Sequence, residues 1–92
     1  MDPVVTDNPS RHRFELRMGD TVAGFAAYRL EPGRVVFTHT EIDPAFEGQG
    51  LGGKLAAAAL DAVRARGLAI VPQCPFIAAY VRRHPEYQDL VV

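Results

Sequence analysis

A glycine-rich segment near the middle of the chain has the residue types needed to bind an anion through its backbone. Residues 47–53 read Glu-Gly-Gln-Gly-Leu-Gly-Gly and run directly into residues 54–60, Lys-Leu-Ala-Ala-Ala-Ala-Leu, a strong helix-forming sequence. A helix that begins at such a turn presents unpaired backbone N–H groups and the positive end of its dipole to one point. Because glycine has no Cβ, the backbone can approach a phosphate or diphosphate closely. The segment therefore predicts a site for a phosphorylated ligand, and a glycine-rich turn without a ligand is the alternative.

Two common nucleotide-binding motifs do not fit this segment. The glycines of residues 48–53 match the dinucleotide pattern G-x-G-x-x-G, but that pattern belongs to a parallel βαβ unit with an acidic residue about twenty positions further on. Residues 68–71, which form the next predicted strand, contain no acidic residue. A P-loop closes with Gly-Lys-Ser/Thr, whereas Leu55 follows Lys54 here. The context therefore disfavours both NAD and a magnesium-bound nucleotide.

The elements before this segment read as an antiparallel meander. Alternating polar and apolar residues predict a strand at 13–18, a turn at 19–20 and a second strand at 21–30. The Glu-Pro-Gly sequence at 31–33 predicts another turn, followed by a third strand at 34–42. On a two-residue period, one face of the third strand carries Val35, Phe37, His39 and Glu41, and the other carries Val36, Thr38, Thr40 and Ile42.

The elements after it alternate between helix and strand. An apolar stripe predicts a helix at 51–66, and the wholly apolar run at 68–71 predicts a buried strand parallel to the third, because a helix intervenes. A second helix is expected to begin at Pro75 and to end near His84, before Pro85. The tail is a candidate last strand. The order predicts an α/β (α+β) fold.

Composition limits the number of domains and the classes of partner. Ninety-two residues predict one domain, placed at 13–92, after a flexible leader at 1–12 that holds two prolines and shows no periodicity. Ten basic and eleven acidic residues disfavour nucleic acid as a partner. The longest apolar run, residues 55–60, is far short of a membrane span, and no Cys/His pairs have zinc spacing. A lone cysteine, Cys74, and no signal peptide predict a reducing compartment, most simply the cytoplasm.

An antiparallel meander that leads into a glycine loop and helix, then a strand and a second helix, resembles the core of the GNAT superfamily of N-acetyltransferases. That superfamily's loop pattern, Gln/Arg-x-x-Gly-x-Gly/Ala, aligns with residues 47–52. The chain is more closely similar to the short single-domain group of YjdJ-like N-acetyltransferases. This group's segments correspond to His39-Thr40-Glu41-Ile42, Gly48-Gln49-Gly50-Leu51-Gly52, Pro72-Gln73-Cys74-Pro75-Phe76, Tyr80 and His84-Pro85-Glu86-Tyr87. The resemblance covers residues 13–90.

The resemblance implies acetyl-coenzyme A as the ligand and an amine as the acceptor. It places the diphosphate on the loop and the pantetheine arm between the third strand and residues 68–71. The cofactor-binding residues so implied are Gln49, Gly50, Leu51, Gly52, Gly53 and Lys54. Glu47 departs from the superfamily's Gln or Arg and is not expected to bind phosphate. The chain also lacks the N-terminal helices of larger relatives, so we expect the acceptor side to be open or to be completed by a partner or a second copy.

Acyl transfer to an amine needs a base, donors for the oxyanion and a proton for the leaving thiolate. His39 and Glu41 are candidate bases. The alternatives are that His39 packs in a polar niche and that Glu41 pairs with an arginine. Cys74 precedes a helix, where a thiolate is stabilised, so it is a candidate proton relay, acetyl carrier or partner in a mixed disulfide. Its alternative is a small buried hydrophobe. Tyr80 is a candidate donor to the leaving sulfur or a core residue.

Two functions from different classes follow. The first is an enzyme that transfers acetyl from acetyl-coenzyme A to an unidentified amine. The second is a non-catalytic module that binds acyl-coenzyme A as a sensor or as a subunit of a partner. The unusual Glu47 and the missing N-terminal helices favour the second, and the expected gathering of candidate side chains around the thioester favours the first.

Overall fold

Five strands form a single sheet in the computed structural model, which describes residues 2–92. The sheet order is β1-β2-β3-β4-β5, with each of the first three strands antiparallel to the next and β5 parallel to β4. The strands are β1 (Val4–Asn8), β2 (Arg13–Met18), β3 (Thr21–Glu31), β4 (Arg34–Ile42) and β5 (Ala69–Pro72). The predicted meander and the predicted parallel strand are therefore confirmed.

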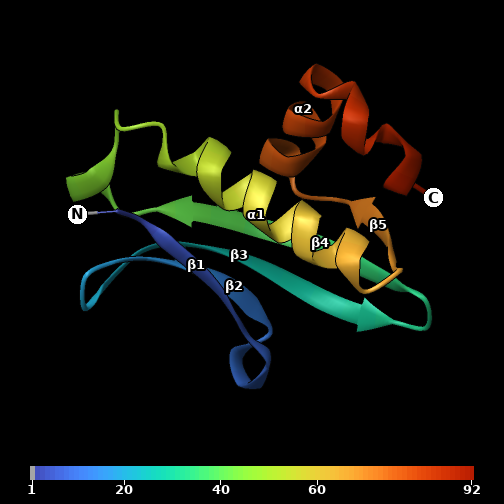
Figure 1. The fold of residues 1–92 in the computed structure, drawn as a ribbon, viewed down its shortest axis with the longest axis horizontal. Coiled ribbons are helices and arrows are strands. Elements are labelled where there is room, and N and C mark those ends of the chain that lie inside the picture. The colour runs from blue at the N-terminus through green and yellow to red at the C-terminus, as the bar shows by residue number, and fades with distance from the viewer. Residues whose placement is uncertain (1) are drawn as a thin grey trace.

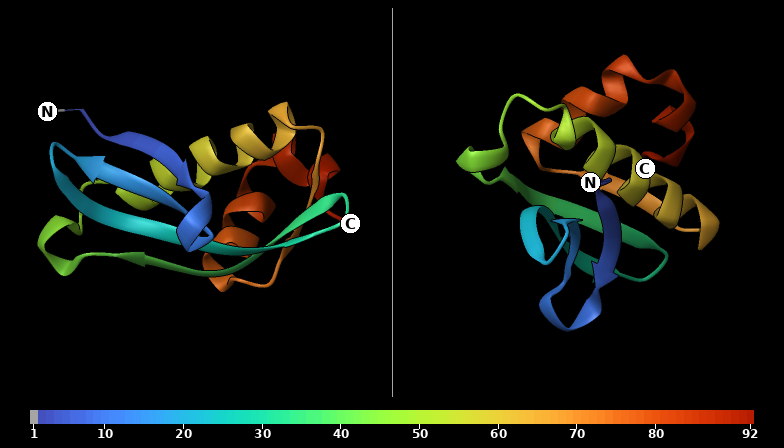
Figure 2. Two further views of the ribbon diagram at one scale, coloured as in Figure 1. Left: turned by 90° about the horizontal axis from the view of Figure 1, so that it is seen from below. Right: turned by 60° about the vertical axis from the view of Figure 1, so that its left-hand side comes forward.

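Two α-helices pack on one face of this sheet. The helix α1 (Leu51–Ala65) connects β4 to β5 and lies across the sheet, and α2 (Pro75–Arg83) follows β5 and lies beside α1 (Figures 1 and 2). Within residues 2–92, no helix covers the opposite face of the sheet. None of the helices in this described part is long and apolar enough to cross a membrane.

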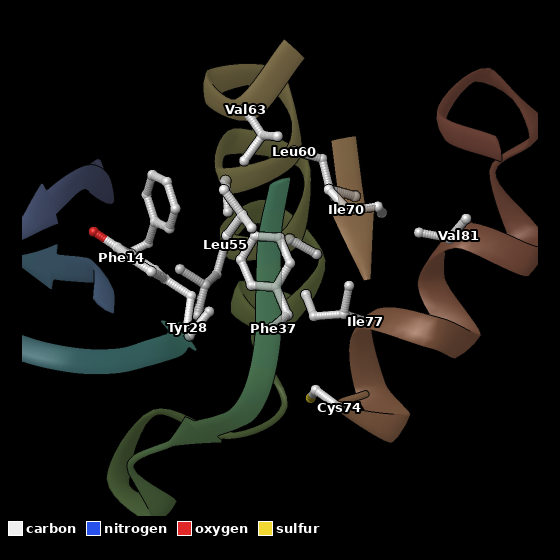
Figure 3. Close-up of a cluster of buried hydrophobic side chains, with 14 of the residues drawn as sticks. Phe14, Tyr28, Phe37, Leu55, Leu60, Val63, Ile70, Cys74, Ile77 and Val81 are labelled. Carbon is white, nitrogen blue, oxygen red and sulfur yellow. The ribbon is translucent and has the colours of Figure 1, made fainter. Parts of the chain in front are cut away.

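The hydrophobic core fills the space between the sheet and the two helices (Figure 3). Its largest fully buried side chains come from every layer: Leu16 and Phe37 from the sheet, Leu55 from α1, Ile70 from β5 and Ile77 from α2. One core shared by all of these elements makes residues 2–92 a single α/β unit. This architecture confirms the predicted fold class.

The C-terminal tail is a 3-10 helix rather than the candidate last strand. It spans Pro85–Leu90, and only Val91 forms a single parallel bridge, to Ile70 of β5. Tyr87 and Leu90 are buried in the core, and their spacing of three residues matches one turn of a 3-10 helix. The tail thus buries its apolar residues without adding a strand.

The predicted N-terminal leader is wrong for residues 4–8, which form β1. This strand pairs with all of β2 except Met18, from Val4 opposite Arg17 to Asn8 opposite Arg13. The prolines that suggested a leader, Pro3 and Pro9, flank the strand, where they remove no ladder hydrogen bond. Met1 also belongs to the predicted leader but lies outside the described residues.

Asp7 fixes β1 to the rest of the domain. Its carboxylate accepts a 2.6 Å hydrogen bond from the hydroxyl of Tyr28 on β3 and forms a 2.8 Å ion pair with Arg66, just after α1. Burial, together with the hydrogen bond to Asp7, raises the pKa of Tyr28 to about 12. The Asp7 side chain therefore links the edge strand β1 both to β3 and to the end of α1.

Replacing Asp7 with alanine is expected to lower the free energy of unfolding by about 1–3 kcal/mol, because the buried Tyr28 hydroxyl loses its acceptor. Tyr28→Phe removes the donor itself, so no buried hydroxyl is left without an acceptor, and Asp7 stays paired with Arg66. We therefore expect a smaller loss of about 1 kcal/mol. Urea unfolding of the two variants measures both values. An Asp7→Ala variant as stable as the wild type would contradict the role of Asp7.

An irregularity in β4 changes which of its side chains face the helices. Tyr28 pairs with Phe37, but its neighbour Ala27 pairs with His39, so Thr38 is an extra residue in β4. Such a β-bulge reverses the alternation of side chains that follow it. The predicted face of Val35, Phe37, His39 and Glu41 is therefore wrong beyond Phe37: Thr40 and Ile42 point to the helix side, and His39 and Glu41 point to the opposite face.

Candidate functional site

The strands β4 and β5 separate and leave an open edge. Their pairing ends at Phe37 opposite Pro72, and the Cys74 N–H then donates a 2.8 Å hydrogen bond to the Phe37 carbonyl. Beyond this point β4 continues to Ile42 with only β3 as its neighbour. Residues 38–42 thus form a strand edge beside the start of α2.

The backbone groups on this edge are available for pairing. The N–H of Asp43, just after β4, donates a 2.7 Å hydrogen bond to Ala23 of β3. Because backbone groups alternate along a strand, those of Glu41 point to β3 and those of Thr40 and Ile42 point to the open edge. An extended ligand can form strand-like hydrogen bonds there.

The glycine loop leads to an uncapped start of α1, as its sequence predicts. The N-cap residue Gly50 has a φ of 71°, in the left-handed region, and no side chain caps the helix. Gly48 also has a positive φ, of 82°. Both positions favour glycine for conformational reasons alone. The N–H groups of the first turn of α1 are left to face an anion.

The remaining two glycines of the loop differ in what they do. A Cβ on Gly52 would lie 2.8 Å from the ring of Phe76 on α2, so the close contact of the two helices requires glycine here. A Cβ on Gly53 would lie 3.8 Å from the Tyr80 ring, an ordinary contact, and Gly53 lies inside α1. Neither backbone conformation nor packing therefore explains Gly53, a residue that costs helix stability.

Two cavities meet at this loop. The larger, of about 630 Å³, lies between α1 and α2, and the smaller, of about 450 Å³, lies between the loop and the open edge of β4. They share Gly50, Gly53 and Phe76 as lining residues. The two cavities therefore adjoin at the start of α1, and we refer to them together as the channel.

Cys74 lies beside the smaller cavity and contacts a residue that the sequence did not single out as a site residue. The thiol is buried, and its Sγ lies 3.2 Å from the Oγ1 of Thr40, which lines the cavity. Cys74 is the N-cap residue of α2, as predicted. The two-residue period of the sequence places Thr40 on the other face, because no residue type in β4 marks the bulge.

His39 and Glu41 are brought together, but away from Cys74. The Nε2 of His39 lies 3.0 Å from an Oε of Glu41, and both side chains are 60% exposed. His39 also packs edge-on against Phe25 of β3, with ring centroids 6.1 Å apart. The pair lies on the uncovered face of the sheet, whereas Thr40 and Cys74 lie on the helix face. Glu41 has His39 as its partner rather than the arginine considered as an alternative.

Tyr80 lines the larger cavity. Its ring stacks on His84 with centroids 3.8 Å apart, and the Nδ1–H of His84 donates a 2.8 Å hydrogen bond to the Tyr80 carbonyl. Burial raises the pKa of Tyr80, and the charges of Glu86 and Asp61 act in the same direction. Tyr80 follows Cys74 by six positions, about 9 Å along a helix axis, so the structure does not bring these two candidates together.

Of the other predicted ligand-binding residues, Lys54 lines the larger cavity, Leu51 lines the smaller one and Gln49 lines neither. Gln49 is exposed in the loop, Leu51 is buried at the start of α1, and Lys54 is exposed on the first turn. Glu47 is exposed and lines the smaller cavity. The site as a whole can hold an extended ligand with an anionic group at the loop and a reactive end near Cys74.

Comparisons with known proteins agree with this geometry. Residues 13–90 match the family model of the GCN5-related N-acetyl-transferases. The fold is similar to the solution structure of a GCN5-like protein from Staphylococcus aureus, with a TM-score of 0.73 and 22% identity over 97% of this chain and 87% of that chain. No curated protein matches the chain. Assignment to the YjdJ-like subgroup stays a prediction. Because the family model spans most of the sequence, the chain belongs to the GCN5-related N-acetyltransferases.

Proposed function

We propose that this protein transfers the acetyl group of acetyl-coenzyme A to an amine. One observation carries the proposal: the channel passes the uncapped start of α1 and then reaches the open edge of β4 at Thr40, whose hydroxyl contacts Cys74. An anionic carrier with an extended arm and a reactive end matches this order of features. Membership of the family supports the same ligand.

The diphosphate would bind to the backbone N–H groups of residues 49–53. Gly53 supports this placement, because neither its conformation nor its packing requires glycine, whereas a phosphate close to the backbone does. The pantetheine arm would then lie along the backbone of Thr40 and Ile42 in the smaller cavity. This arrangement brings the thioester toward Cys74.

The side chains around the thioester have separate tasks. His39 and Glu41 flank the edge of β4 from the uncovered face, which is open to an amine, and either can take the proton that the attacking nitrogen loses. A bond then forms between nitrogen and the acetyl carbon, and the carbon–sulfur bond breaks. Cys74 and Thr40 lie on the helix side and can supply a proton to the leaving thiolate. Alternatively, Cys74 accepts the acetyl group first and passes it to the amine.

A second candidate function is binding of acyl-coenzyme A without turnover. Its support is the separation of the candidate bases from Cys74 by the sheet, together with Glu47 in the smaller cavity. Under this reading Cys74 and Thr40 are packing residues. The two functions differ in whether an amine releases free coenzyme A.

Release of thiol from acetyl-coenzyme A with a panel of amines tests the proposal. We expect Cys74→Ala to slow turnover by about 100-fold or more while coenzyme A still binds, because a positioned proton donor or nucleophile contributes at least this much. Thr40→Val tests whether the Thr40 hydroxyl takes part in this proton transfer, and Glu41→Gln tests the base. Stabilisation by acetyl-coenzyme A without turnover above background for any amine would instead establish the binding function. Equal stabilisation by NAD would contradict both functions.

A further inference from the structure

The larger cavity carries positive charge that the diphosphate loop does not account for. Lys54 and Arg83 both line it, and no aspartate or glutamate does. Among residues 2–92, neither of these cations forms an ion pair, whereas Arg64 pairs with Asp89 at 2.9 Å and Arg66 pairs with Asp7 at 2.8 Å. The two cations thus face a shared space without an acidic partner in the described chain.

The order of contacts along α2 fixes the direction of the channel. Phe76 lies opposite Gly52, and Tyr80, one turn later, lies opposite Gly53. Arg83 follows Tyr80 by three residues, about 4.5 Å further along the helix axis. Cys74 begins the same helix at its other end. A ligand with its reactive end at Cys74 and its diphosphate at the loop therefore extends past Tyr80 toward Arg83.

We propose that Lys54 and Arg83 bind a phosphate monoester on the ribose of the ligand, so that the protein selects coenzyme A over dephospho-coenzyme A. The inference rests on the proposed function and adds a second phosphate site to it. A guanidinium binds phosphate through two parallel hydrogen bonds, and an ammonium across the cavity adds a point charge. The ribose 3′-phosphate is the only group of coenzyme A that offers such an anion beyond the diphosphate.

Calorimetry with coenzyme A and dephospho-coenzyme A tests this selection. The wild type is expected to bind coenzyme A about 10- to 100-fold more tightly, the range that a charge-assisted contact provides. Arg83→Gln should weaken binding of coenzyme A about 10-fold and leave binding of dephospho-coenzyme A unchanged. In the double variant Lys54→Gln/Arg83→Gln the ratio of the two affinities should approach one.

Arg82→Gln is the matched control. Arg82 is an exposed neighbour of Arg83 on the same helix turn and does not line the cavity, so its loss removes the same charge from the surface. We expect it to change neither affinity. Equal binding of the two ligands by the wild type, or an equal loss of both in Arg83→Gln, would overturn the second phosphate site and leave the proposed function standing. Binding of neither ligand by the wild type would overturn both.

Discussion

Replacing Gly53 with aspartate is expected to stabilise the ligand-free protein and to abolish binding of acetyl-coenzyme A. Gly53 is the third residue of α1, where a carboxylate interacts favourably with the helix dipole and where glycine costs helix stability. These two effects predict a gain of about 0.5–1 kcal/mol in the free energy of unfolding. The added side chain has room, because a Cβ would lie 3.8 Å from Tyr80.

The same carboxylate would repel the ligand. Gly53 lines both cavities, so the new charge would lie where the diphosphate is proposed to bind. Two like charges 4 Å apart near a protein surface repel by about 4 kcal/mol, which corresponds to a loss of at least 100-fold in affinity. Urea unfolding and calorimetry measure the two opposite effects. Gly53→Asn is the neutral control and should retain more of the binding; equal affinities for the two variants would contradict an anion at this loop.

Replacing Phe37 with alanine is expected to cost about 3–5 kcal/mol of stability, the range for a fully buried aromatic residue. The ring is 0% exposed and lies between Leu55 of α1 and Ile77 of α2 (Figure 3). Domains of this size are stable by only about 5–15 kcal/mol, so the loss removes a large share of the total. The carbonyl of the same residue holds the N–H of Cys74, so the contact between β4 and α2 should loosen as well.

Phe37→Leu is the control variant, because it reduces the volume of the side chain but keeps an apolar group in the core. Leucine keeps most of the apolar contact, and we expect it to cost about 1.5 kcal/mol or less. Urea unfolding of both variants, followed by titration with coenzyme A, tests the expectation. This loss is well below the usual range if the free energy of unfolding of Phe37→Ala falls within about 1 kcal/mol of the wild-type value. Such a result would mean that the packing of the helices does not depend on this ring.

Most of the fold was predictable because its signals are local. Tight turns at Gly19 and Gly33 and the apolar stripe of α1 determine strands and helix from neighbouring residues alone. The N-terminal strand was not predictable in this way. Val4 to Asn8 form an edge strand that Asp7 links to Tyr28 and Arg66, and both of these partners are far away in sequence.

The site was predictable at the loop but not at the strand. The start of α1 is encoded by adjacent glycines, whereas the facing of β4 depends on one extra residue at Thr38. Because side chains alternate with a period of two, this one residue moves His39 and Glu41 to the far face and brings Thr40 to Cys74. The need for glycine at position 52 was equally hidden, since it comes from Phe76 on another helix.

The open edge of β4 also affects the solubility of the protein. Unpaired strand edges recruit further strands and so promote aggregation. Here the unpaired stretch is short, residues 38–42, and the exposed His39 and Glu41 side chains flank it. Short edges and charged side chains are the features that discourage a second strand. A small extended molecule can therefore occupy the edge where another protein chain is discouraged, and ligand binding should reduce self-association of the protein.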